Sequence, residues 1–283
     1  MTTFAERARI HTVEGGGGVQ LHVREWGNPD GPPIVFIHGW SQNHLCWAKQ
    51  YESTLADDFR LVAFDLRGHG MSDAPLEPEH YTDARLWADD VAAIIDALSL
   101  DRPVLVGWSY GAFAICDYVR AYGTRRLTAI EFVEGAVKLG EQAFGTLIGP
   151  GFLDYFAHAT ADDLPTNIWA MRAFLRACVA RPLPADEFET ALCWNIAVPA
   201  RIRANLAARE IDDDDVLRTL DVPLLVTQGR EDTVVLPAMA EHLLATCPTA
   251  EASWYESVGH APHLEEPERF NRELAELARR ARA

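Results

Sequence analysis

The chain has 283 residues and is 48% hydrophobic, which is enough for one large α/β domain or for one domain with an insertion. Its 42 acidic and 25 basic residues give a formal net charge of −17, and this argues against nucleic acid or an anionic membrane as a partner, because both are polyanions. The five cysteines lie far apart and form no Cys-x-x-Cys pair, so we expect free, mostly buried thiols in a reducing compartment.

The N-terminal part of the chain predicts two strands joined by a hairpin. Residues 1–10 lack the continuous apolar run of a signal peptide, and no later stretch is apolar over the length of a membrane span, so we expect a soluble, cytoplasmic protein. Residues 10–13 and 19–25 alternate as strands do. The four glycines at 15–18 are interpreted as a flexible turn rather than a phosphate-binding loop, because no helix or Gly-Lys-Ser/Thr follows them.

The middle of the chain alternates between continuous apolar strands and helices, which is the pattern of a parallel sheet buried on both faces. The strands at 34–37 and 60–64 run into loops that begin at His38 and Asp65. The other elements predicted here are a helix from Thr82 or Asp83 to Leu98, a strand, turn and helix over 104–115, and a strand over 127–133 that ends at Glu134.

Residues 136–219 are expected to be a helical insertion, because helical patterns rich in aromatic residues replace the strands there. The four aspartates at 212–215 are interpreted as a solvated helix start rather than as a metal site. The helices predicted in the insertion begin at Thr166 or Asn167 and stop at Pro182, then span 184–197 and 200–210. Alternation resumes with a strand at 223–228, a helix at 239–245, a strand at 252–256 and a helix after Pro267.

Ser109 is the leading candidate for a nucleophile. It lies in the pattern Gly-x-Ser-x-Gly between an apolar strand and a helix, flanked by Gly107 and Gly111. Such a sharp turn exposes the serine at the carboxyl end of the strand, and the glycines let the helix lie close to neighbouring strands. The first N–H groups of the helix have no partners in the helix itself, so they can stabilise an oxyanion.

Asp232 and His260 each follow one of the last two strands and can complete this chemistry. A neutral imidazole can accept the serine proton at pH 7 and return it to the leaving group, and a carboxylate can orient the imidazole. His263 is a rival of His260 for the role of base, and Glu231 is a rival of Asp232 for the role of acid.

These motifs resemble those of the α/β-hydrolase superfamily over nearly the whole chain. The resemblance implies the α/β-hydrolase fold, with an eight-stranded, mostly parallel sheet flanked by helices and a helical cap inserted after strand six. Residues 1–135 and 220–283 would form the core domain, and residues 136–219 the helical cap. The matching segments are His38-Gly39-Trp40, Asp65-x-Arg67-Gly-x-Gly-x-Ser72, the turn from Gly107 to Gly111, Gly229-x-x-Asp232 with Pro237, and Gly259-His260.

The resemblance also implies roles for individual residues. Ser109 would be the nucleophile, His260 the base and Asp232 the acid, and the backbone N–H groups of Trp40 and Tyr110 would form the oxyanion hole. No metal and no cofactor are implied.

Other residues in these motifs have alternative interpretations. A few branches of the superfamily place the acid after the sixth strand, where Glu134 stands, so Glu134 remains an alternative to Asp232. His38 and His69 are expected to make structural hydrogen bonds, and Arg67 is expected to be a buried loop anchor paired with a carboxylate.

Aromatic side chains of the insertion and of the serine turn are expected to line an apolar pocket. The sequence therefore predicts a serine hydrolase of the carboxylesterase or lactonase type, which cleaves a small, uncharged, fairly hydrophobic ester through an acyl-enzyme. No Asp stands in the turn, which excludes the branch that forms an alkyl-enzyme ester. The candidate pocket residues are His38, Trp108, Phe152, Phe156, Trp169 and Trp194.

Other reactions on the same residues stay open. The resemblance extends to C–C bond hydrolases, to perhydrolases known as non-haem haloperoxidases and to cofactor-free dioxygenases, and the fold alone does not separate them. A small-molecule receptor with little turnover is a further alternative. The expected partner is a small-molecule substrate, and the sequence does not indicate an oligomeric state.

Overall fold

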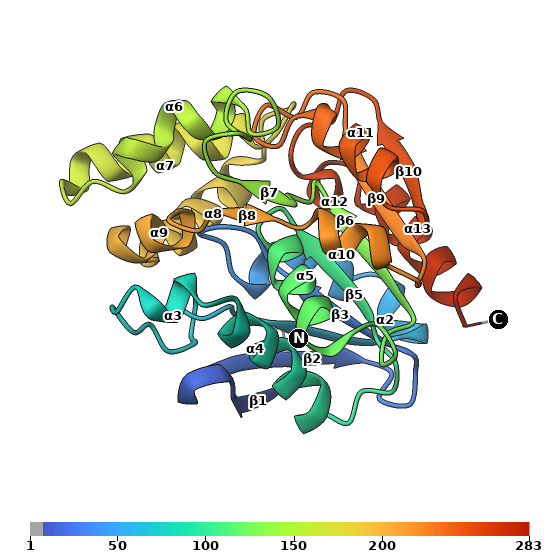
Figure 1. The fold of residues 1–283 in the computed structure, drawn as a ribbon. Helices are drawn as coiled ribbons and strands as arrows, with labels where there is room; N and C mark the ends of the chain where they lie inside the picture. The colour runs from blue at the N-terminus through green and yellow to red at the C-terminus, as the bar shows by residue number, and fades with distance from the viewer. Residues whose placement is uncertain (1–7, 283) are drawn as a thin grey trace.

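Eight strands form the central sheet in the computed structural model, which describes residues 8–282 (Figure 1). They are β1 (Arg9–Glu14), β2 (Gln20–Gly27), β3 (Pro33–Ile37), β4 (Arg60–Phe64), β5 (Val104–Trp108), β6 (Ala129–Val133), β9 (Leu224–Gly229) and β10 (Ala250–Tyr255). Their order is β1-β2-β4-β3-β5-β6-β9-β10. The pairs β1–β2 and β2–β4 are antiparallel and the other pairs are parallel. The predicted eight-stranded, mostly parallel sheet is confirmed.

Helices cover both faces of this sheet. Neighbouring residues of a strand point to opposite faces, so each strand contributes to two hydrophobic cores. Val35 and Ile37 of β3 pack in the core that includes the helices of one face, whereas Ile34 and Phe36 pack in the core of the other. The first face is covered by α4 (Ala84–Ala97), α5 (Gly111–Tyr122), α10 (Asp214–Thr219) and α11 (Pro237–Thr246). The second is covered by α1 (Ala48–Tyr51), α2 (Leu55–Asp58) and α13 (Pro267–Arg280).

The parallel strands β3, β5, β6, β9 and β10 all point the same way, so the loops that leave them meet at one edge of the sheet. Ligands of open α/β sheets bind at this carboxyl edge. The shorter elements of the described chain are η2 (Gly16–Gly18), η3 (His44–Trp47), α3 (Glu79–Thr82) and α12 (Pro262–Glu265).

Between β6 and β9 the described chain has α10 and four further helices, and Figure 1 shows these four together on one side of the sheet. They are α6 (Pro150–Ala159), α7 (Leu164–Ala177), α8 (Ala185–Ala197) and α9 (Ala200–Ala207). The predicted start of α7 at Thr166 or Asn167 is wrong, because Asp163 caps the helix by accepting a hydrogen bond from the Thr166 N–H. The predicted start of β6 at residue 127 is also wrong, because the strand begins at Ala129.

The insertion also contains two short strands where none was predicted. β7 (Lys138–Leu139) and β8 (Ile211–Asp212) pair in antiparallel fashion. Two residues are too few to produce an alternating pattern in the sequence, so these strands could not be recognised from it.

The glycine turn at 15–18 is an anchored turn rather than a flexible one. The Gly16 N–H donates to Asp90 Oδ1, and the Gly16 carbonyl accepts from the Arg67 guanidinium. That guanidinium also donates two hydrogen bonds of 2.7 and 2.8 Å to the Asp90 carboxylate. The predicted role of Arg67 as a buried anchor paired with a carboxylate is confirmed.

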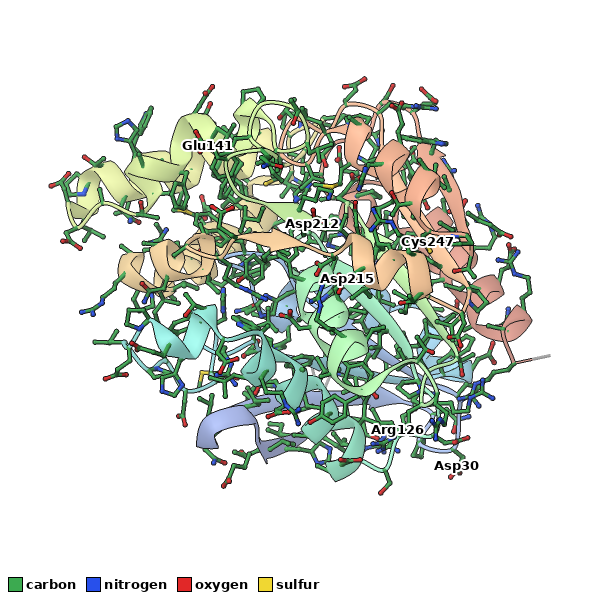
Figure 2. The ribbon with its side chains drawn as sticks, in the orientation of Figure 1. Asp30, Arg126, Glu141, Asp212, Asp215 and Cys247 are labelled. Carbon is green, nitrogen blue, oxygen red and sulfur yellow. The ribbon has the colours of Figure 1, made fainter. Side chains whose placement is uncertain are left out.

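The aspartate run at 212–215 does begin a helix, but it is only partly solvated. Figure 2 shows the labelled Asp212 and Asp215 near β8 and α10. Asp213, between them, is buried and accepts a 2.8 Å hydrogen bond from Arg120. Burial raises the pKa of Asp213 to about 6. The expectation of a fully solvated run is therefore wrong for this residue.

The cysteines behave as predicted in the described chain: all five are free, and only Cys193 is exposed. None of the helices formed by residues 8–282 combines the length and the apolar character that a membrane span requires. The prediction about a signal peptide falls mainly on residues 1–7, which lie outside the described residues.

Candidate active site

Ser109 occupies a strained turn between β5 and α5. Its φ is 53°, in the left-handed region that side chains other than glycine rarely adopt, and its N–H donates to the Val133 carbonyl at 2.9 Å. A Cβ at Gly111 would come within 2.4 Å of the Ile37 carbonyl oxygen, and a Cβ at Gly107 within 2.9 Å of the Ala112 nitrogen. Both flanking positions therefore require glycine, as the sequence pattern indicated.

His260 and Asp232 form a buried pair. His260 Nδ1 lies 2.7 Å from Asp232 Oδ2. The other carboxylate oxygen, Oδ1, accepts the N–H groups of Val234 at 2.7 Å and Val235 at 3.1 Å. These bonds fix the carboxylate in one orientation, and the carboxylate in turn directs the free ring nitrogen of His260 away from itself.

The backbone of His260 is held from two sides. Its N–H donates to the Cys178 carbonyl at 2.9 Å, and its carbonyl accepts the Trp108 indole N–H at 2.7 Å. Trp108 immediately precedes Ser109, so the histidine loop is tied directly to the serine turn.

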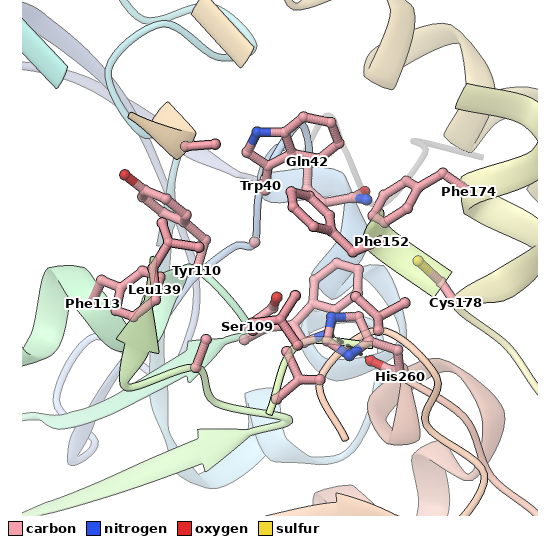
Figure 3. A pocket seen from close by; sticks show the side chains of 17 residues that line it. Trp40, Gln42, Ser109, Tyr110, Phe113, Leu139, Phe152, Phe174, Cys178 and His260 are labelled. Atoms are coloured by element: carbon pink, nitrogen blue, oxygen red, sulfur yellow. Dashed lines mark hydrogen bonds between the residues drawn. The ribbon is translucent and has the colours of Figure 1, made fainter. Parts of the chain in front are cut away.

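Ser109 and His260 line the same cavity, which holds about 570 Å³ of empty space including the part that is open to solvent (Figure 3). None of the described residues that line it is an Asp, Glu, Lys or Arg, so it is suited to an uncharged molecule. The lining residues are Gly39, Trp40, Gln42, Trp108, Ser109, Tyr110, Phe113, Ala136, Leu139, Ile148, Phe152, Phe174, Cys178, Ala207, Val234, Val235 and His260.

Two backbone N–H groups are available beside the serine. Trp40 and Tyr110 both line the cavity, and neither backbone N–H donates a hydrogen bond to any described residue. Gly39 brings the first of these groups close, since a Cβ there would lie 3.2 Å from the Ser109 Cβ. Tyr110 caps the N-terminus of α5, where the helix dipole favours negative charge.

The alternative candidates for the base and the acid are His263, Glu231 and Glu134, and each lies in a different environment. His263 is fully buried against the rings of Trp47 and Trp108, and neither of its ring nitrogens has a hydrogen-bond partner among the described residues. Glu231 is exposed beside the buried Asp232. Glu134 is buried near Asp232, but the hydrogen bond from His260 goes to Asp232.

His38 and His69 are structural, as predicted. His38 Nδ1 bonds to the Gly39 carbonyl at 2.8 Å and its Nε2 accepts the Leu66 N–H, while His69 Nε2 accepts the Ser41 N–H. Burial lowers the pKa of His38 to about 3 and that of His69 to about 4, so both rings are neutral near pH 7.

Of the six residues expected in the pocket, Trp108 and Phe152 line the cavity and the other four do not. His38 is buried, and its ring is bonded to the carbonyl of the next residue, Gly39. Phe156 packs behind Trp40, and Trp194 donates its indole N–H to Gln42 instead of facing the cavity. Trp169 is 54% exposed.

Several lining residues were missed by the sequence prediction. Val234 and Val235 lie two and three positions after Asp232, and this proximity was a usable signal because their N–H groups bind its carboxylate. Gln42 and Cys178 carried no such signal. Gln42 reaches the cavity rim through hydrogen bonds with Trp194 and Asn195 of the insertion.

Two clusters of side chains are rich in potential metal ligands, and in each of them one histidine is hydrogen-bonded to an aspartate. One cluster is His22, His44 and Asp65, in which His44 Nδ1 lies 2.7 Å from Asp65 Oδ1. The other contains the His260–Asp232 pair and Glu134.

Comparison with known proteins shows the family to which the chain belongs. The model of a family described as "Alpha/beta hydrolase family" matches residues 34–273. A non-heme chloroperoxidase from Streptomyces lividans is 30% identical over 289 residues, covering 93% of this chain and 97% of that protein. A solved structure of a candidate aryl esterase from Burkholderia cenocepacia is 36% identical, with a TM-score of 0.91 over 96% of this chain and 99% of the other. The esterase RhEst1 from Rhodococcus sp. ECU1013 is 34% identical, with a TM-score of 0.90 and coverage of 95% and 98%. The chain belongs to the alpha/beta hydrolase family and has the fold of that family.

Proposed function

We propose that the protein is a serine esterase that hydrolyses small, uncharged, hydrophobic esters through an acyl-enzyme. The observation that carries the proposal is that Ser109 and His260 line one apolar cavity while His260 is bonded to the buried Asp232. The esterases from Burkholderia and Rhodococcus, which are similar over nearly their whole length, support the same reaction class.

In the proposed reaction, Ser109 Oγ attacks the ester carbonyl and His260 Nε2 takes the hydroxyl proton. The backbone N–H groups of Trp40 and Tyr110 stabilise the oxyanion that forms. His260 then protonates the departing alcohol, which leaves Ser109 acylated. A water molecule, deprotonated by the same imidazole, releases the acid and restores the serine.

Asp232 orients the imidazole and stabilises its charged form during these transfers. Its Oδ1 is held by two backbone N–H groups, so the carboxylate keeps its position when the proton moves. The aromatic and aliphatic walls exclude water and favour hydrophobic acyl or alcohol groups, because charged groups would be desolvated there without a partner.

The test is hydrolysis of p-nitrophenyl acetate, butyrate and octanoate by the purified protein and by Ser109→Ala. We expect turnover with a burst of p-nitrophenol whenever deacylation is slower than acylation, and no turnover above background in the variant. Equal rates for the two proteins would refute the proposal.

A second candidate activity is perhydrolysis, which the similarity to the Streptomyces chloroperoxidase favours. Hydrogen peroxide would replace water in the attack on the acyl-enzyme, so that an ester gives an alcohol and a peracid. Peracid formation from an ester and hydrogen peroxide, lost in Ser109→Ala, would support this activity, and its complete absence at rates of measurable hydrolysis would exclude it.

A further inference from the structure

Glu134 is a fully buried carboxyl group at the carboxyl end of β6. Its φ is 48°, so the backbone adopts a left-handed conformation that is costly for a residue with a side chain. Its Oε1 accepts a hydrogen bond from the N–H of Gly229, the last residue of β9 and the start of the loop that carries Asp232. Glu134 thus connects two neighbouring strand ends of the sheet.

The carboxyl group of Glu134 lies beside the His260–Asp232 pair. One oxygen of Glu134, one oxygen of Asp232 and one ring nitrogen of His260 all lie within 4.8 Å of one another. The Glu134 Oε2 atom is buried and receives no N–H or O–H from any described residue. A buried, unpartnered carboxylate oxygen is costly, whereas a protonated oxygen in this place can itself donate a hydrogen bond.

The surroundings determine which of the two carboxyl groups is ionised. Two carboxylates this close cannot both carry a charge in a buried site. Asp232 accepts three hydrogen bonds, from Val234, Val235 and His260, whereas Glu134 accepts one. These hydrogen bonds favour the negative charge on Asp232 and the proton on Glu134.

Burial and the other acidic groups near Glu134 also favour its protonated form. Burial raises the pKa of Glu134 well above its ordinary value, and the charge of Asp232 raises it further. The charge of Glu265, whose carboxylate accepts the Gly259 and Ala180 N–H groups, also raises the pKa of Glu134, but by less. The basic group that faces the pair in this cluster is His260.

We propose that Glu134 is a positioning residue for Asp232: as a neutral carboxylic acid, it donates a hydrogen bond from Oε2 to the Asp232 carboxylate and holds the carboxylate against His260. The inference rests on the proposed function, in which Asp232 orients the base. It differs from the alternative in which Glu134 replaces Asp232 as the acid, because here Glu134 acts through Asp232.

A donor on Glu134 has two consequences for the reaction. It restricts the Asp232 carboxylate to the geometry in which Oδ2 meets His260, and it draws negative charge away from the bond to the imidazole. Removing the donor would leave more charge facing His260, which would stabilise the imidazolium and raise the pH at which the base loses its proton.

Two substitutions of similar length separate this role from a packing role. Glu134→Gln is also neutral, and its amide can accept the Gly229 N–H and donate to Asp232. Glu134→Met fills similar space but has no donor. The pH profile of kcat/KM for p-nitrophenyl butyrate is measured for the wild type and both variants, together with the melting temperature of each.

We expect Glu134→Gln to keep kcat/KM within about threefold and to keep the acid limb of the profile. Glu134→Met is expected to lose about tenfold or more, with the acid limb at higher pH. An acid limb at lower pH in Glu134→Gln would show that Glu134 is ionised and would overturn the inference, as would a Met variant equal to the wild type. Equal losses in both variants with unmoved limbs would also overturn it, leaving a packing role.

Failure of the proposed function is distinguishable from failure of this inference. A wild type without Ser109-dependent turnover would refute the esterase proposal. The pH at which the His260 ring loses its proton can then be measured by NMR in the three proteins. We expect this pH to be unchanged in Glu134→Gln and higher in Glu134→Met. An unchanged His260 titration in Glu134→Met would overturn the inference independently of activity.

Discussion

The indole N–H of Trp108 donates a 2.7 Å hydrogen bond to the backbone carbonyl of His260, a residue 152 positions further along the chain. Trp108 is also the neighbour of Ser109, so one side chain fixes the distance between the serine turn and the histidine loop. In the proposed mechanism this distance determines whether the hydroxyl and the imidazole can exchange a proton.

Trp108→Phe should therefore damage activity as well as stability. The His260 carbonyl would lose its donor in a buried position, at a cost of about 1–3 kcal/mol in the free energy of unfolding, and we expect kcat to fall by about tenfold because the loop loosens. The control is Trp26→Phe, since the Trp26 indole N–H is buried without a hydrogen-bond partner among the described residues. Esterase kinetics and chemical denaturation check both values, and equal kcat in the two variants would argue against the link.

Ser109→Gly and Ser109→Ala should lose activity equally but differ in stability. Both lack the hydroxyl, whereas only glycine adopts the observed φ of 53° without strain. We expect the glycine variant to be more stable than the alanine variant by about 1 kcal/mol. Urea unfolding measures the difference, and an alanine variant of greater stability would show that the turn relaxes in solution.

His260 and His263 should respond in opposite ways to substitution. His260→Ala is expected to lower kcat by about 10³- to 10⁶-fold, as removal of the base does in serine triads. His263→Leu should keep the activity and the stability, because the ring is packed among apolar groups and its nitrogens have no partners in the described chain. Loss of turnover in His263→Leu with normal folding would assign the base to His263 instead.

Glu131 on β6 should make stability depend on pH. It is fully buried, its Oε1 accepts the Thr227 hydroxyl, and burial raises its pKa to about 8. A raised pKa in the folded state stabilises the protein below the ordinary value near 4.5, and this stabilisation is lost as the pH rises through about 8.

Glu131→Gln keeps the neutral form at every pH. We expect it to be more stable than the wild type by about 1–3 kcal/mol at pH 7 and to equal the wild type near pH 4. Melting temperatures at pH 4, 7 and 9 check this. A wild-type advantage at pH 7 would mean that the carboxylate is ionised in the fold.

Phe152→Ala should change the preference for acyl length. Phe152 lines the cavity and packs against Trp40 at 5.2 Å between ring centroids, so its removal enlarges the apolar space. We expect kcat/KM for octanoate relative to acetate to rise by about tenfold. Trp169→Ala is the control, because Trp169 is exposed and lies outside the lining. The same shift in both variants would mean that the cavity does not bind the acyl chain.

The sequence predicted those features that depend on local patterns. The Gly-x-Ser-x-Gly turn, the apolar strands and the polar residues at strand ends are each encoded within a few positions, and parallel topology brings the strand ends together. That is why Ser109, Asp232 and His260 could be identified as candidates from the amino-acid sequence alone.

The pocket walls depend on contacts that no short pattern contains. Trp169 and Phe174 lie on the same helix, yet one is exposed and the other lines the cavity, because the packing of α6 against α7 decides which side is covered. The burial of Asp213 depends in a similar way on Arg120, which is far away in the sequence. The residue types at these positions therefore give only a set of candidates for the pocket walls and the buried sites.

The most direct test of the account is to identify the residue that becomes covalently modified. The wild type is treated with a fluorophosphonate, which phosphonylates an activated serine, and the site is mapped by peptide mass spectrometry. We predict a single adduct on Ser109 that forms rapidly in the wild type and at least about 10³-fold more slowly in His260→Ala. An unmodified wild type, an adduct on another residue, or equal rates in the two proteins would contradict the assignment of Ser109 as the nucleophile activated by His260.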